Sequence, residues 1–295
     1  MHPLIAAPAL RNQRPMIRLF VCLIAVVVVA LASPAVASAQ NPSPTPDDAV
    51  LKLAEPDFTL ISLPTSLRLP KFKSAFRVTH RFTRPLSCDA CPNSLAGDAF
   101  GLDGGAVIGL EYRIGIVPNG EVGIHRTGDK TIELFGQYGL TRQGQSSPVE
   151  TSALVAIDIS DVGRKNTDSQ YSPTLGLIVS RLIGDQGAVY VEPIWVHHSN
   201  LFQPAVTDDS TFMIGLGARV RISATVYVVA EIAPRVSGYK PGVNHGSFGI
   251  EKRAGGHMFQ LNFSDSFGTT LGQLARGGSS SKDWYLGFNL TRKFY

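Results

Sequence analysis

The chain has 295 residues, of which 44% are hydrophobic and 17% are charged, with a formal net charge of +4. This composition excludes a disordered tail, because disordered segments combine low hydrophobicity with high net charge. It also excludes a helical membrane protein, since the only long apolar run, residues 19–32, has 14 residues and a spanning helix needs roughly 20. Any membrane-spanning role is therefore left to strands.

The N-terminus has the pattern of an export signal. Arg11, Arg14 and Arg18 precede the apolar run, and residues 37–39 follow it with the small-x-small pattern of a signal-peptidase site. We predict a signal peptide over residues 1–39. A short buried helix is the alternative interpretation of the run.

Most of the net charge belongs to this segment. Removing residues 1–39 takes away three arginines and no acidic residue, which changes basic against acidic residues from 27 against 23 to 24 against 23. A nearly neutral mature chain without interleaved basic and aromatic runs does not indicate nucleic-acid binding. Cleavage also removes Cys22, so export leaves Cys88 and Cys91 in an oxidising compartment.

Residues 40–70 differ in composition from the rest of the chain. They hold six of its prolines, Pro42, Pro44, Pro46, Pro56, Pro64 and Pro70. Because such composition favours extended chain over packed structure, we predict a periplasmic lead-in over residues 40–70, with a short helix near residues 47–54.

From Lys71 onward, apolar residues recur at period two, which is the signature of pleated strands. The alternation predicts about twelve strands within residues 71–295. They centre on residues 72–82, 106–112, 122–124, 132–140, 153–157, 175–183, 189–195, 212–222, 226–232, 248–250, 259–263 and 284–294.

Polar and charged residues occupy the other face of these strands. In a soluble sandwich that face meets solvent, whereas in a transmembrane barrel it lines the lumen and the apolar face meets lipid. In the barrel interpretation the lumen is lined by Glu111, Arg113, Glu121, Glu133, Glu192, Arg219, Glu231 and Glu251.

Two features favour the barrel over a secreted sandwich. Short connections, such as residues 184–187, alternate with mostly longer ones, such as residues 85–105, as in outer-membrane barrels. The chain also ends in an alternating segment, residues 284–294, that resembles the C-terminal strand by which barrel-assembly machinery recognises its substrates. We predict an all-β, antiparallel up-and-down barrel in the outer membrane of a Gram-negative-type bacterium, with outer-membrane lipid and the assembly machinery as its partners.

Three stretches resemble a bacterial family described as a membrane-bound β-barrel domain of unknown function. They are residues 249–266, which include a Gly-Gly-His-x-Phe-Gln-Leu segment, residues 287–294, and residues 100–103 with 109–112. The resemblance covers about residues 77–294 and implies a fold and a membrane location. It implies no reaction or ligand.

A candidate catalytic stretch follows the seventh predicted strand. His197 and Ser199 are two apart, so on a continuous strand they share a face as general base and nucleophile. Together with Asn200 they resemble the His-x-Ser-Asn stretch of PagL-type lipid A deacylases, in which an acidic residue follows about a dozen positions later. Here Asp208 or Asp209 takes that place, although the family has Glu there and the spacing needs a small deletion. The alternative is that these polar residues lie at the rim of the barrel without a catalytic role.

Cys88 and Cys91 have the spacing of a redox dithiol, half a zinc site or a haem attachment. Pro92 replaces the histidine of a haem motif, no strand-to-helix context supports a thioredoxin-like site, and no second ligand pair for zinc follows nearby. A small structural disulfide is the favoured interpretation, and we predict no metal or cofactor.

The sequence thus predicts a non-enzymatic barrel that acts as a narrow passive pore for small solutes or as a structural or surface-binding protein. The alternative is an outer-membrane lipid acyl hydrolase that uses His197, Ser199 and Asp209.

Overall fold

The computed structural model describes residues 52–88, 91, 93–144, 147–162, 170–201, 207–278 and 280–294. These residues belong to one compact unit. The predicted signal peptide and the first part of the predicted lead-in, residues 40–51, lie outside the described residues. No helix within the described part of the chain has the length and hydropathy to cross a membrane.

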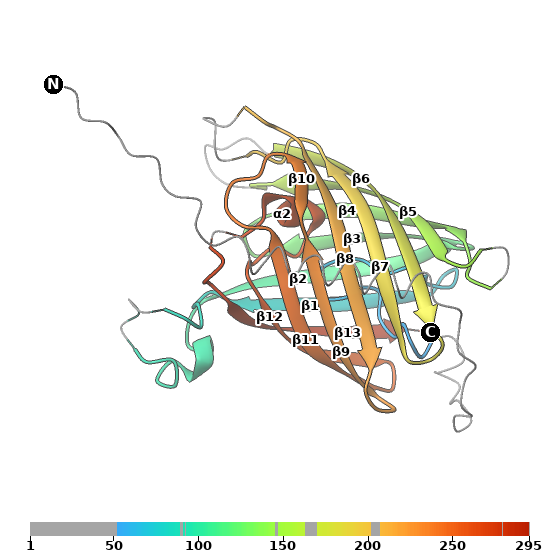
Figure 1. Cartoon of the computed structure of the whole chain (residues 1–295), viewed down its shortest axis with the longest axis horizontal. Coiled ribbons are helices and arrows are strands. Elements are labelled where there is room, and N and C mark those ends of the chain that lie inside the picture. The colour runs from blue at the N-terminus through green and yellow to red at the C-terminus, as the bar shows by residue number, and fades with distance from the viewer. Residues whose placement is uncertain are drawn as a thin grey trace. The chain divides into compact units, whose positions relative to one another are not determined.

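The described chain is almost entirely strand (Figure 1). The strands are β1 (Ser74–Phe82), β2 (Ala106–Val117), β3 (Gly120–Thr127), β4 (Ile132–Thr141), β5 (Glu150–Ser160), β6 (Gln170–Ile183), β7 (Gly187–Val196), β8 (Thr211–Arg221), β9 (Val226–Ala233), β10 (Arg235–Gly238), β11 (His245–Ala254), β12 (His257–Ser264) and β13 (Tyr285–Phe294). Two short helices, η1 (Ala99–Gly101) and α2 (Leu271–Arg276), lie in connections.

The strands form one closed antiparallel barrel. From β1 to β8 each strand pairs with the next, β8 pairs with both β9 and β10, and β9 pairs with β11, which continues to β12 and β13. β13 pairs with β1 from Ser74 opposite Phe294 onward, which closes the ring. β9 and β10 both pair with β8 and are two parts of one wall strand, interrupted at Pro234. The wall therefore has twelve strands, which confirms the predicted up-and-down barrel and excludes the two-sheet sandwich.

The period-two pattern sorts side chains between the two faces of the wall. On β2, Leu110 and Tyr112 are 50% and 43% exposed, whereas Glu111 and Arg113 are 2% and 4% exposed. A shift of one residue in strand register would exchange these faces. The apolar residues therefore cover the outside of the barrel, and most of the charged strand residues lie inside.

The connections differ in length between the two ends. At the near end, where β1 begins and β13 ends, β2–β3, β6–β7 and β11–β12 are joined by short turns. At the far end, residues 83–105, 197–210 and 265–284 form long connections. The connection of residues 128–131 is a short exception at the far end.

The lead-in prediction is wrong for the described part of residues 40–70. Residues 54–67 are buried, and Leu60, Ile61 and Leu63 are 0% exposed within the barrel. The proline-rich composition disfavours regular helix, but it does not prevent an extended segment from folding back on itself inside a lumen. No described residue of the predicted helix near residues 47–54 is helical, since residues 52–54 form an isolated bridge and a turn.

The outward face can be tested by placing a charge on it. Leu261 lies mid-strand in β12 and is 52% exposed. If this face meets lipid, Leu261→Arg should destabilise the barrel by about 2–4 kcal/mol in phospholipid vesicles, measured by denaturant unfolding.

Leu102 provides the matched control, since it is 55% exposed but lies in the long connection between β1 and β2. Leu102→Arg should leave stability almost unchanged. Equal effects of the two substitutions would contradict a lipid-facing wall.

Candidate functional site: the filled lumen

The inner wall carries the eight charged residues that the sequence predicts for the lumen. All of them are between 0% and 5% exposed: Glu111, Arg113, Glu121, Glu133, Glu192, Arg219, Glu231 and Glu251. Each side chain occupies an inward position of its strand. Whether these charges line an open passage then depends on what else lies between them.

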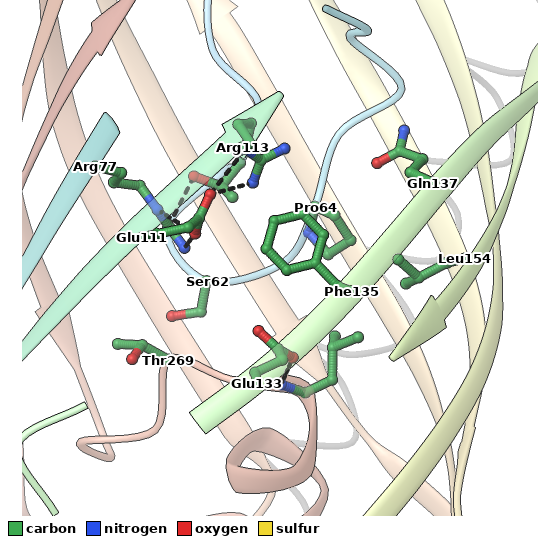
Figure 2. A pocket seen from close by; sticks show the side chains of 12 residues that line it. Ser62, Pro64, Arg77, Glu111, Arg113, Glu133, Phe135, Gln137, Leu154 and Thr269 are labelled. Atoms are coloured by element: carbon green, nitrogen blue, oxygen red, sulfur yellow. Dashed lines mark hydrogen bonds and ion pairs between the residues drawn. The ribbon is translucent and has the colours of Figure 1, made fainter. Parts of the chain in front are cut away.

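On the side formed by β1, β2 and β3, the charges pair with one another. Glu111 accepts hydrogen bonds from Arg77 Nε at 2.9 Å and Arg113 Nε at 2.8 Å, and Arg113 Nη1 donates to Glu121 at 2.7 Å. Figure 2 shows the arginines on either side of Glu111. Across the barrel, Arg219 donates to both carboxylate oxygens of Glu251, at 2.6 and 2.9 Å. Because buried charges are tolerated when paired and hydrogen-bonded, these networks let charged side chains remain inside.

Residues 52–69, which we call the plug, occupy the space between the charged side chains. The plug folds back on itself as a tight hairpin in which Leu60 N donates to Leu63 O at 2.8 Å and Thr65 N donates to Phe58 O at 2.9 Å. Its tip, residues 60–63, lies against β8, since a Cβ added to Gly217 would lie 2.1 Å from Leu60 Cδ1. A side chain at this position would force the end of the Leu60 side chain to move.

Glu231 on β9 holds the tip of the plug. Its carboxylate accepts backbone hydrogen bonds from Ile61 at 2.9 Å, Ser62 at 2.8 Å and Leu63 at 3.0 Å. The carboxylate also lies 3.1 Å from His245 Nε2. Three consecutive N–H groups of a turn would otherwise be buried without acceptors, and hydrogen bonds to a charged group contribute about 1.5–3 kcal/mol each.

Other wall side chains bind the carbonyl groups of the same turn. Arg219 donates to Thr59 O at 2.6 Å, Gln260 donates to Leu60 O at 2.7 Å, and Asn289 donates to Ile61 O at 2.8 Å. The plug backbone is therefore satisfied by side chains of β8, β12 and β13 instead of by a strand ladder.

Two further contacts fix the returning arm of the plug. Ser66 Oγ lies 2.5 Å from Ser180 Oγ on β6, and Leu69 N donates to Glu121 at 2.9 Å. At the near end, Lys52 forms an ion pair with Glu150, and Arg68 Nη2 donates to Thr141 O and Thr151 O. These bonds bind both arms of the hairpin to the wall.

A second segment enters the lumen from the far end. Residues 265–278, which we call the inner loop, carry α2, whose Thr270 and Gln273 form a capping box. Leu271 N donates to Glu133 at 2.9 Å, and Thr270 Oγ1 donates to Asp158 at 2.5 Å. Capping side chains and wall carboxylates thus satisfy the first turn of the helix.

The plug and the inner loop meet in one hydrophobic core. Leu60, Ile61 and Leu63 of the plug pack in the same cluster as Leu271 and Leu274 of α2. The wall contributes Leu154, Ile178, Tyr190, Ile194, Val196, Met213, Val229 and several alanines. At roughly 2 kcal/mol for each buried aliphatic side chain, this cluster adds substantially to the polar contacts.

Little space remains between the two segments. The cavity drawn in Figure 2, lined by Ser62, Glu111, Phe135 and Leu271 among others, has a volume of about 30 Å³. This is close to the volume of one water molecule in the liquid. The predicted lumenal charges therefore face a filled interior.

Glu192 on β7 differs from the other wall carboxylates. It is 0% exposed, and neither carboxylate oxygen has a hydrogen-bond partner among the described residues. Its strand neighbour is Gly215, beside which Leu63 packs. Glu192 thus gives the plug no hydrogen bond.

The candidate catalytic residues of the alternative interpretation do not come together. His197 is exposed, stacks on Trp195 and lies 2.9 Å from Ser210 Oγ, whereas Ser199 is buried and lies 2.8 Å from Thr211 Oγ1. The strand ends before these residues, and the positive φ of His198, 51°, breaks the alternation that would have given them one face.

The acidic residue of this alternative, Asp209, pairs with a different histidine. Asp209 lies 3.0 Å from His198 Nδ1, and no hydrogen bond between Asp209 and His197 occurs in the described structure. His197, Ser199 and Asp209 therefore do not form a set of base, nucleophile and orienting acid in this structure.

Cys88 and Cys91 form a disulfide in the connection between β1 and β2. Their sulfur atoms are therefore not thiols in this structure. The described residues contain no cluster of three or more histidine, cysteine or acidic side chains suited to a metal ion.

Sequence reasoning missed the apolar half of the lumen. Tyr190, Ile194 and Val196 share the inward parity of Glu192, and the outward residues of β7 are also apolar. A run that is apolar on both faces indicates a strand buried on both sides, and that signal was present in residues 187–196. The leucines of the plug were a second signal, since they have no burial partner in an extended periplasmic segment.

The fold and the filled interior define a membrane β-barrel whose lumen is closed by two of its own segments. The chain belongs to the membrane bound beta barrel domain family, whose model matches residues 57–294. The match begins within the plug, so the family domain includes the hairpin as well as the wall.

Solved structures with similar strand arrangements are distant. The NanC porin is 6% identical over 76% of this chain and 99% of its own, with a TM-score of 0.47. An outer membrane channel from Pseudomonas putida F1 is 11% identical over 77% and 97%, also at 0.47, and outer membrane phospholipase A from Escherichia coli is 11% identical over 75% and 90%, at 0.42. At these scores the similarity says nothing about what the chain does. No curated protein sequence matches the chain.

The position of the plug can be tested by a cross-link. Because Ser66 Oγ and Ser180 Oγ are 2.5 Å apart, Ser66→Cys with Ser180→Cys should form a disulfide when the protein is refolded under oxidising conditions. Peptide mapping by mass spectrometry would detect it.

The matched control pairs Ser66→Cys with Ser172→Cys, since Ser172 is also a buried serine on β6. It lies about 26 Å along the strand from Ser180 and should give no cross-link. Equal cross-linking of both pairs, or of neither, would contradict the placement of the plug.

The hold of Glu231 on the plug can be measured separately. Glu231→Gln keeps the shape but removes the charge that three N–H groups share, so the plug should be destabilised by about 2 kcal/mol. Hydrogen exchange at the amides of residues 61–63 should then become about 30-fold faster.

Glu192→Gln is the control, because Glu192 is equally buried but has no plug contact of this kind. It should leave exchange at these amides unchanged, because it removes no hydrogen bond to the plug, and overall stability should stay almost the same, since one unpartnered polar side chain replaces another of the same size. The same acceleration in both variants would contradict the role of Glu231.

Proposed function

We propose that the protein is an outer-membrane channel that rests closed and conducts small polar solutes only when the plug and the inner loop leave the lumen. Export by the predicted signal peptide and insertion by the barrel-assembly machinery are parts of this proposal. The family assignment supports a membrane location, and the alternating lengths of the connections favour the outer membrane with the near end toward the periplasm.

The proposal rests on one observation. Carboxylate side chains of the wall accept hydrogen bonds from backbone N–H groups of the plug and of the inner loop. Glu231, Glu121 and Glu133 each accept such bonds, from the plug tip, from Leu69 and from Leu271. These bonds are specific to the position of the segments, yet water can replace all of them. When the segments leave, the part of the wall that these carboxylates line is charged and readily hydrated.

A barrel whose lumen stays closed does not require charged side chains on its inner wall. Burying charged groups is costly, and well-packed apolar residues are often at least as stabilising as a buried ion pair. A lumen that is always closed could be filled by leucine and valine side chains alone. The retained charges on β2, β3 and β11 are therefore better explained by a lumen that opens to water.

Conductance of the mature protein in a planar lipid bilayer tests the proposal. The wild type should be closed for most of the time, because only about 30 Å³ remains between the plug and the inner loop. Deletion of residues 52–69 should give small, flickering currents, since the inner loop then loses its apolar partners at residues 60–63.

Deletion of residues 269–277 alone should leave the plug in place and conductance low. Deletion of both segments should give stable open steps. Heat-dependent gel mobility would confirm in each case that the wall has folded. A folded double deletion that never conducts would contradict the channel and favour a structural or surface-binding barrel.

A further inference from the structure

Basic side chains gather on the outer face of the wall at the near end. They are Lys252 near the end of β11, His257 at the start of β12 and Arg292 near the end of β13. Each shares the outward parity of the apolar residues on its own strand, as Lys252 does with the exposed Ile250. The cluster therefore lies where the apolar band of the barrel ends.

Strand pairing brings the three residues together. His257 lies directly opposite Arg292 in the ladder of β12 and β13. Lys252 lies diagonal to His257 in the ladder of β11 and β12, one pair away from Ala254 opposite His257. Directly opposed side chains are neighbours, and diagonal ones lie about 7–8 Å apart. Because a lysine side chain is long and flexible, a group bound by Arg292 is also within reach of Lys252.

Arg292 is held in place by its neighbours. Its Nη1 donates to His257 Nδ1 at 3.1 Å, and its Cζ lies 5.9 Å from the centre of the Phe294 ring. Gly256 leaves room for it, since a Cβ added there would lie 2.9 Å from Nη1. A guanidinium group only donates, so His257 accepts through Nδ1 and carries its hydrogen on Nε2. Arg292 and His257 thus present N–H donors from one fixed arrangement.

No acidic residue faces these side chains from the outside of the neighbouring strands. Glu251 is the only acidic residue of β1, β11, β12 and β13, and it is buried in the lumen against Arg219. At the far end, outward positions of the same strands carry aromatic rings instead, such as Phe248 stacked on Phe263. On these four strands, outward lysine and arginine therefore occur only at the near end.

Two of the stretches that resemble the barrel family meet at this cluster. Residues 249–266 contribute Lys252, the glycine turn and His257, and residues 287–294 contribute Arg292. These side chains lie on the outer face of the wall, so the packing of the plug does not account for them.

We propose that the cluster binds the phosphate group of an anionic phospholipid in the leaflet at the near end. Arg292 and His257 donate N–H groups to the phosphate oxygens, and Lys252 adds a mobile positive charge. The acyl chains lie along exposed apolar side chains such as Phe259 and Leu261, which continue from the cluster toward the middle of β12. A lipid is the occupant that fits, because the cluster borders the face that meets the bilayer.

Competition between two lipids with the same acyl chains tests the proposal. The full mature protein in detergent is mixed with equal amounts of phosphatidylglycerol, which is anionic, and phosphatidylcholine, whose own cation balances its phosphate. Native mass spectrometry then identifies the retained lipid. One phosphatidylglycerol molecule should be retained roughly twentyfold more often than phosphatidylcholine. Equal retention of the two lipids would overturn the proposal.

Variants then locate the site. Arg292→Gln and Lys252→Gln should each lower the preference about fivefold, which is the effect of one basic residue at an anionic lipid surface. Arg126→Gln is the matched control, because Arg126 is an exposed, outward arginine at the far end of β3. It should leave the preference unchanged, and heat-dependent gel mobility would confirm folding in each case. Equal weakening by all three substitutions, or no weakening by the first two, would overturn the assignment.

This inference does not depend on the channel. The cluster lies on the outside of the wall, so a silent bilayer recording would leave it intact. Conversely, a protein that conducts without selecting phosphatidylglycerol would overturn the lipid site and keep the channel.

Discussion

A closed barrel of twelve strands encloses more space than its own inward side chains fill. Barrels of eight strands are filled by side chains, and those of sixteen or more leave an aqueous channel. In this twelve-stranded barrel, two segments of the chain fill the remaining space. The plug enters from the near end and the inner loop from the far end. Many polar contacts of the interior follow from the need to satisfy the backbones of these segments.

Several polar and charged side chains of the inner wall meet that need. An irregular segment inside a lumen has no neighbouring strand to bind its N–H and C=O groups, and each unsatisfied buried group is costly. Glu231 binds three N–H groups of the plug tip, and Gln260 and Asn289 bind its carbonyl groups. Apolar side chains of β5 to β9 pack against the leucines of the plug and of α2.

The wall was predictable from the sequence, whereas the contacts of the segments inside it were not. Alternation at period two is local, so the strands, their inward charges and the number of wall strands could all be inferred from residues such as Glu111 and Tyr112. The plug depends on contacts between residues far apart in the sequence, such as Ile61 with Glu231, and no local pattern reports them. A single backbone angle, the positive φ of His198, was enough to separate His197 from Ser199, and the alternation rule could not anticipate it.

The central claim is that the position of the plug decides whether the lumen conducts. The most direct test records single-channel currents from the inner-loop deletion in which Ser66→Cys and Ser180→Cys are also present, first oxidised and then reduced in the same bilayer. Our account predicts no opening while the disulfide holds the plug, and brief, infrequent openings after reduction, when the plug can leave the lumen. Currents that are the same before and after reduction, whether open or silent, would contradict it.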